Sequence, residues 1–175
     1  MVIDRGGYRL NVGIILINDS GRVFWGKRQG HDAWQFPQGG FLEGESAIQA
    51  MYRELQEEIG LTKEDIKIIG VTKRWLKYRL PPQYIRHSKK PIVIGQKQKW
   101  FLIKLVTSEQ KIRLDLSDSP EFDSWRWIDY ESPAKQVIFF KQQVYQQALK
   151  ELEQYTKKRK VGSGLFKKRI SNLNA

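Results

Sequence analysis

The sequence contains no cysteine and no long apolar run. Without cysteine in its 175 residues, the chain has no disulfide, no thiolate zinc site and no cysteine nucleophile. No stretch reaches the roughly 18 apolar residues that a membrane-spanning helix needs. The first residues, MVIDRGGYRLNVG, lack the basic start and apolar centre of a secretory signal. We therefore expect a soluble, cytoplasmic protein with no membrane partner.

Histidine is scarce as well. His31 and His87 are the two histidines, and their separation in the sequence gives no sign of a ligand pair. Ser46 and Ser132 lack a histidine partner and the sharp turn that exposes a nucleophile. The sequence therefore favours neither a histidine metal site nor a covalent serine mechanism.

Basic residues outnumber acidic ones and are unevenly placed. The chain has 31 Lys and Arg against 19 Asp and Glu, a net charge of +12. Residues 72–100 contain nine basic residues and no acid, and residues 157–175 contain seven and no acid. A local excess of positive charge attracts polyanions such as nucleic acid. At this length we expect one domain, residues 1–156, followed by a basic, flexible tail, residues 157–175.

Hydrophobic patterning predicts strands and helices along that domain. Apolar, β-branched runs separated by turn residues indicate strands, the first two forming a hairpin through NDSG. Apolar residues at spacings of three and four indicate amphipathic helices, the first capped by Ser46 and ended by Gly60. The predicted strands cover residues 11–19, 22–28, 65–80, 98–106 and 124–129, and the predicted helices cover residues 46–60 and 135–155.

The first predicted helix carries three glutamates close together. Glu54 lies three and four positions from Glu57 and Glu58, so the three side chains share one face, off the predicted apolar stripe. Like charges so close repel one another, and Arg53 is the local counter-charge. A divalent cation such as Mg²⁺ or Mn²⁺ removes the conflict because it prefers hard oxygen ligands. A solvated acidic face is the alternative interpretation.

The spacing of residues around these glutamates matches a known motif. Residues 39 to 61 follow the pattern G-x5-E-x7-R-E-U-x-E-E-x-G-U, where U is apolar, and the chain thereby resembles the Nudix hydrolase family. The resemblance implies an α/β fold, an α/β/α sandwich with a central mixed β-sheet, and hydrolysis of a nucleoside diphosphate linked to a further group. The matching positions are Gly39, Glu45, Arg53, Glu54, Leu55, Glu57, Glu58, Gly60 and Leu61.

The same resemblance implies roles for the motif residues. Glu54, Glu57 and Glu58 would bind Mg²⁺ or Mn²⁺, with more than one ion in the site. One of them, or a carboxylate on another loop, would accept the proton of the attacking water. Arg53 would orient a glutamate, Glu45 would support the loop, and Gly39 would present its carbonyl to a metal. Glu121 is either an additional metal ligand or an ordinary surface residue.

Other segments resemble the bacterial RNA pyrophosphohydrolases within this family. The resemblance runs from about Tyr8 to about Lys150 and includes GYRLNVGIILIN, WQFPQGG, MYREL, IGQKQKWFL, PEFDSWRW and FFKQQVY. It implies conversion of the 5′-triphosphate end of RNA to a monophosphate, which starts mRNA decay. The candidate phosphate donors are Arg9, Lys27, Arg28, Gln96, Lys97 and Lys99. The resemblance also implies base contacts from Ile138 and Phe140 with Lys141 nearby, although both apolar residues also suit a core.

Two other functions remain open on this sequence. A dinucleoside polyphosphate hydrolase, acting on diadenosine tetra- or pentaphosphate, would use the same metal helix. A noncatalytic nucleotide- or RNA-binding Nudix module would have no need for three repelling carboxylates. The basic stretch at residues 72–100 contains aromatic residues that could stack on bases, and this arrangement favours RNA over a small dinucleotide.

Overall fold

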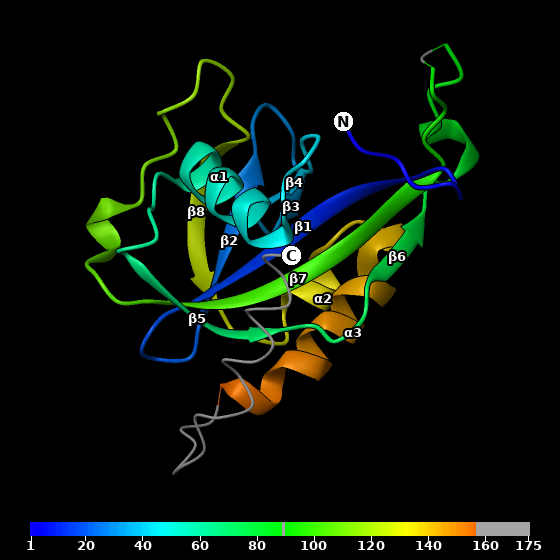
Figure 1. Ribbon diagram of the computed structural model, residues 1–175. Coiled ribbons are helices and arrows are strands. Elements are labelled where there is room, and N and C mark those ends of the chain that lie inside the picture. The colour runs from blue at the N-terminus through cyan, green and yellow to red at the C-terminus, as the bar shows by residue number, and fades with distance from the viewer. Residues whose placement is uncertain (89, 157–175) are drawn as a thin grey trace.

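A computed structural model describes residues 1–88 and 90–156 of the chain (Figure 1). The predicted basic tail, residues 157–175, lies outside the described residues. Within the described part, no helix is both long enough and apolar enough to cross a membrane.

Eight strands form one mixed sheet within the described residues. The order β3-β2-β1-β7-β5 is completed by β4 beside β1, β6 beside β7 and β8 beside β2. The central pair β1 and β7 is parallel, and the other pairings are antiparallel. The strands are β1 (Tyr8–Ile17), β2 (Val23–Arg28), β3 (Trp34–Gln35), β4 (Gln38–Gly40), β5 (Ile66–Val71), β6 (Leu76–Arg79), β7 (Gly95–Leu105) and β8 (Phe122–Ile128).

Helices cover both faces of this sheet. Figure 1 shows α1 (Ala47–Ile59) on one side, and α2 (Pro133–Gln136) and α3 (Gln142–Leu152) on the other. Each side has its own apolar core, one packed under α1 and one under α2 and α3. The predicted α/β/α sandwich with a mixed sheet is therefore confirmed. Short 3₁₀ helices cover Pro82–Tyr84, Glu109–Lys111, Phe139–Lys141 and Glu153–Tyr155.

The boundaries of α1 are those expected from its sequence. The Ser46 side chain accepts a hydrogen bond from the Gln49 backbone, and the Gln49 side chain accepts one from the Ser46 N–H. This reciprocal pair satisfies two amides that the first turn leaves free. Gly60 ends the helix with φ of 72°, a left-handed conformation that a residue without a Cβ adopts at little cost.

The prediction of one helix over residues 135–155 is wrong. The chain leaves the helix at Val137, whose ψ of 155° is extended, and returns to helical geometry after Ile138. This break buries Val137 in the core beneath α3 and turns Lys141 inward. Periodicity along the chain does not report such a break, since burial in the assembled core outweighs local helix preference. The predicted strand at residues 65–80 is likewise two strands, β5 and β6.

Candidate active site

Arg53 on α1 gathers the side chains around the predicted motif. Its guanidinium donates to both oxygens of Glu45, at 2.8 and 2.9 Å, and to Glu54 at 2.7 Å. It also donates to Glu57 at 3.2 Å and to the carbonyl oxygen of Gly40 at 2.8 Å. Charge-assisted hydrogen bonds of this kind are roughly twice as strong as neutral ones, and those from Arg53 lower the pKa of Glu45. Arg53 therefore ties the helix to β4 and to the loop before α1.

The three glutamates differ in burial, contrary to the expectation that all lie off the buried stripe. Glu54 and Glu58 are 8% and 9% exposed, whereas Glu57 is exposed. The reason is that β4 approaches this side of α1, and the backbone N–H of Gln38 donates to Glu58 Oε2 at 3.0 Å. Burial raises the pKa of Glu54, and burial together with the charges of Glu54 and Glu121 raises that of Glu58.

Two adjacent glycines in β4 allow this close approach. A Cβ at Gly39 would overlap the carboxylate of Glu54, and a Cβ at Gly40 would overlap the guanidinium of Arg9. The strand thus lies between a carboxylate on one face of the sheet and a cation on the other. No other residue type fits either position without moving a functional side chain.

The acidic residues near α1 have the carboxylate oxygens that a divalent cation prefers, although their side chains are not arranged around a common point. Among residues 1–88 and 90–156, no three acidic or histidine side chains converge on one point, because Arg53 holds Glu54 and Glu57. Carboxylate oxygens are nevertheless the ligands that Mg²⁺ and Mn²⁺ prefer. Burial and mutual repulsion already penalise the charged forms of Glu54 and Glu58. A divalent cation would offset that penalty, so the donor set fits the metal.

A second network joins Glu121 to the segment before α3. Glu121 Oε1 accepts hydrogen bonds from Arg28 Nε at 3.1 Å and from Gln35 Nε2 at 3.0 Å. The buried Lys141 ammonium donates to Gln35 Oε1 at 3.0 Å and to Gln38 Oε1 at 3.2 Å. Burial and the Arg28 charge lower the pKa of Lys141 to about 8. Gln35 and Gln38 are not among the predicted site residues, although both belong to the segment WQFPQGG.

A cavity of about 640 Å³, here the large cavity, lies beside these networks. Within the described part of the chain, Arg9 Nε and Gln96 Oε1 are buried with no hydrogen-bond partner. Buried polar atoms normally have partners, and both residues line the large cavity. The lining residues are Met1, Arg9, Arg28, Gln35, Gln38, Tyr78, Leu80, Tyr84, Arg86, Lys90, Pro91, Val93, Gln96, Glu121, Phe140 and Lys141.

Aromatic side chains form one wall of the large cavity. The Phe140 ring lies 5.8 Å from that of Tyr78 and 5.1 Å from that of Tyr84, centroid to centroid. Phe140 is half-buried, and Tyr84 is 46% exposed. Ile138 lies just before this wall and is 38% exposed, outside the cavity lining. Phe140 therefore has one part packed against protein and another open to a ligand.

Three of the predicted phosphate donors lie away from the large cavity. Side chains alternate across β7, so Lys97 and Lys99 face the α1 side while Gln96 faces the cavity. Lys97 donates to Asp4 at 3.3 Å, and the buried Lys99 donates to the Lys73 carbonyl at 3.1 Å. Lys27 lies on β2 between β3 and β8 and does not line the cavity. Trp100 is fully buried in the core and offers no stacking surface.

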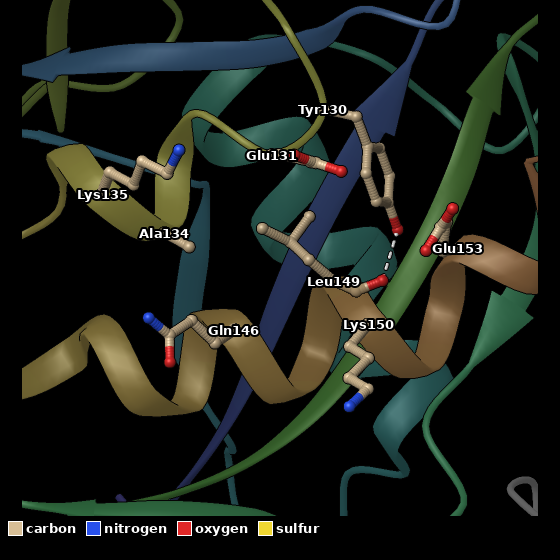
Figure 2. A pocket seen from close by; sticks show the side chains of 8 residues that line it. All are labelled: Tyr130, Glu131, Ala134, Lys135, Gln146, Leu149, Lys150 and Glu153. Atoms are coloured by element: carbon tan, nitrogen blue, oxygen red, sulfur yellow. Dashed lines mark hydrogen bonds between the residues drawn. The ribbon is translucent and has the colours of Figure 1, made fainter.

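A smaller cavity of about 280 Å³ lies between α2 and α3 (Figure 2). Tyr130 crosses it and donates its hydroxyl to the Leu149 carbonyl at 2.9 Å. Lys135 and Lys150 extend from the two helices at its rim, near Glu131 and Glu153. None of the predicted site residues lines this cavity, whereas six of them, Arg9, Arg28, Gln96, Glu121, Phe140 and Lys141, line the large one.

The loop, helix and carboxylates described above carry the spacing of the Nudix motif, and comparison with known proteins shows the family. The NUDIX domain model matches residues 7–148, and the chain belongs to the Nudix family. It is a Nudix hydrolase, an enzyme that acts on phosphoanhydride bonds. Enzymes of this family generally use divalent metal ions.

Several relatives of the chain share the name RNA pyrophosphohydrolase. The chain is 73% identical over 170 residues to the RNA pyrophosphohydrolase of Legionella pneumophila (strain Corby), covering 97% of each chain. It is 58% identical over 151 residues to that of Acinetobacter baylyi (strain ATCC 33305 / BD413 / ADP1), covering 86% of this chain and 91% of the relative.

Solved structures with the same fold cover most of the chain. The E. coli dihydroneopterin triphosphate pyrophosphohydrolase matches with a TM-score of 0.64 and 25% identity, over 81% of this chain and 97% of that one. A C. elegans Ap4A hydrolase binary complex matches with a TM-score of 0.61 and 20% identity, over 84% of this chain and 96% of that one. The second likeness shows the fold alone.

Proposed function

We propose that this Nudix hydrolase is an RNA 5′-pyrophosphohydrolase. It removes pyrophosphate from 5′-triphosphate RNA, leaves a 5′-monophosphate and so initiates mRNA decay. The observation that carries the proposal is the large cavity, which Arg9 and Gln96 line together with the aromatic wall. A triphosphate joined to a base needs both features. The names of the relatives support the same substrate.

Glu54, Glu57, Glu58 and Glu121, with the carbonyl of Gly39, are the residues that would hold Mg²⁺ or Mn²⁺, with more than one ion. When bound, such ions neutralise phosphoryl oxygens and lower the pKa of a bound water. Three of these carboxylates project from one helix, and Glu121 precedes β8 on the opposite wall. Of this set, Glu121 lines the large cavity.

The side chains of the protein do the remaining work. One of the three α1 glutamates accepts the proton of the attacking water. Arg53 orients Glu54 and Glu57 through its hydrogen bonds. Arg9 and Gln96 bind phosphate oxygens through the N–H groups of side chains that line the large cavity. Positioning and charge stabilisation of this kind supply most of the catalysis in phosphoryl transfer.

The first bases of the RNA lie against the aromatic wall. Phe140 stacks on one base, with the buried Tyr78 packed against it and the exposed Tyr84 beside it. Ile138, at the exposed end of this segment, contacts the same region. Beneath them the Lys141 ammonium is held by two amide oxygens, which fixes the segment relative to β4.

The proposal is tested by turnover of three substrates with Mg²⁺: 5′-triphosphate RNA, 5′-diphosphate RNA and diadenosine pentaphosphate. We expect the highest kcat/KM with an RNA substrate and 5′-monophosphate ends in the product. Faster hydrolysis of diadenosine pentaphosphate would favour a dinucleoside polyphosphate hydrolase. Binding without turnover of any of them would favour a noncatalytic module, which the Arg53 and carboxylate network argues against.

A further inference from the structure

One loop forms the outer wall of the large cavity. It connects β6 to β7 (residues 80–88 and 90–94 are described) and is the green segment that projects beyond the sheet at the upper right of Figure 1. Tyr84, Arg86 and Lys90 from this loop line the cavity. We call it the outer loop.

The outer loop is attached to the rest of the site at its ends and its middle. The Leu80 N–H donates to the Ile94 carbonyl at 2.9 Å, and the Ile94 N–H donates to the Gly7 carbonyl at 3.0 Å. Between these ends, the Tyr84 ring lies 5.1 Å from that of Phe140. The loop therefore continues the aromatic wall outward, and its cations have a defined place beside that wall.

The charge of the outer loop has no local counterpart. Residues 72–100 contain no acid, and within the described residues neither Arg86 nor Lys90 has a carboxylate within 4.0 Å. The large cavity is lined by five basic residues and one acid, Glu121, which already accepts from Arg28. Uncompensated cations along a groove attract a polyanion.

We propose that the outer loop binds the RNA chain beyond its first nucleotides, with Arg86 and Lys90 contacting backbone phosphates and Tyr84 extending the stacking surface. This inference rests on the proposed function, because it takes the triphosphate end to lie at Arg9 and Gln96. Cations that follow the backbone and aromatic rings that receive bases are the usual means of holding single-stranded nucleic acid. A dinucleoside polyphosphate ends at its second nucleoside and has no backbone phosphates for this wall.

The test compares two unpaired 5′-triphosphate RNAs, a dinucleotide and a chain of about twelve nucleotides, within the usual site sizes of single-strand binders. Turnover and Kd are measured for the wild type and for the double variant Arg86→Ala/Lys90→Ala. We expect the variant to bind the longer RNA about tenfold more weakly and the dinucleotide within about twofold of wild type. The slope of log K against log salt for the longer RNA should fall by about 1.4, roughly 0.7 per lost contact.

Two control variants test whether the positive charge of the outer loop matters and whether its position matters. The exchange Arg86→Lys/Lys90→Arg keeps both cations and should keep the preference for longer RNA. The double variant Lys63→Ala/Lys67→Ala also removes two positive charges, but near the other end of β7, where Lys67 lies opposite Lys104. It should change the affinity for neither the dinucleotide nor the longer RNA.

The outcomes are distinguishable. Equal losses on both RNAs, or no loss on either, would overturn the role of the outer loop. If the wild type hydrolyses neither RNA, the proposed function fails, while a Kd that depends on Arg86 and Lys90 only for the longer RNA would still support the binding surface.

Discussion

The acidic side of α1 and the large cavity are built in opposite ways. The acidic side comes from residues 39 to 61, a single continuous segment joined by Arg53. The large cavity is assembled from β1, β7, the outer loop, the loop before β8 and the segment before α3. Most of the proposed metal ligands thus lie in one continuous segment, whereas the proposed binding of the substrate depends on contacts between distant parts of the chain.

Their electrostatics differ in the same way. Around α1, the carboxylates of Glu54, Glu57 and Glu58 come from one helix, so this side suits cations. In the large cavity, basic residues outnumber acids, so this side suits phosphates. Strand β4 joins the two regions, with Gly39 against Glu54 and Gly40 against Arg9. A change confined to one region should therefore alter one function and leave the other.

The largest expected effect is on the acidic side. Glu54→Gln keeps the shape of the side chain but removes a charged metal ligand, so kcat should fall at least about a hundredfold. Folding should survive, because burial already disfavours the charged form of Glu54. Glu43→Gln, at an exposed position in the loop before α1, is the matched control. Near-normal turnover of the Glu54 variant at saturating Mg²⁺ would rule out the metal assignment.

Gly39→Ala should have the next largest effect. The added Cβ would displace the Glu54 carboxylate, and a misplacement of about 1 Å in an active site can cost a hundredfold in rate. We expect kcat to fall between about tenfold and a hundredfold, with a circular dichroism spectrum like that of the wild type. If the variant is folded and fully active, β4 does not constrain Glu54 as described.

Phe140→Ala should act on the other region. If Phe140 stacks on a base, the variant should lose about 1 to 3 kcal/mol of oligonucleotide binding. The Phe140 ring is only half-buried. The free energy of unfolding of the variant should therefore fall by less than the about 3 to 5 kcal/mol that a full core truncation costs. Phe139→Ala, at a ring 62% exposed and outside the cavity lining, is the control. Normal RNA affinity in the Phe140 variant would remove the stacking role.

The smallest expected effect concerns Lys141 and pH. Burial and the Arg28 charge lower its pKa to about 8, below the unfolded value of about 10.4. Above pH 8 the unfolded chain therefore binds more protons, and the free energy of unfolding should rise with pH. Between pH 7.5 and 9.5 we expect the wild type to gain about 2 kcal/mol of unfolding free energy relative to Lys141→Met. Urea denaturation at each pH measures the difference in unfolding free energy between the two proteins. A difference that does not change with pH would contradict the expectation.

The sequence predicted the acidic side well because its signals are local. The capping residue Ser46, the terminal Gly60 and the motif spacing lie within one segment, and α1 has the expected boundaries. The burial of Glu54 and Glu58 was missed because it depends on β4 crossing the helix.

The large cavity was predicted only in part. Arg9, Gln96 and Phe140 line it, but Lys97 and Lys99 face the opposite side of the sheet. Alternation along a strand was a usable signal, since neighbouring residues point to opposite faces. No comparable local signal reports the break at residue 137, which depends on packing against the sheet.

The separation of the two regions is tested most directly by steady-state kinetics of the wild type, Glu54→Gln and Phe140→Ala on one unpaired 5′-triphosphate RNA. We expect Glu54→Gln to lower kcat at least about a hundredfold. We expect Phe140→Ala to raise KM about five- to a hundredfold while kcat stays within about threefold of wild type. A Phe140 variant that lost kcat as severely as the Glu54 variant, at unchanged KM, would contradict it.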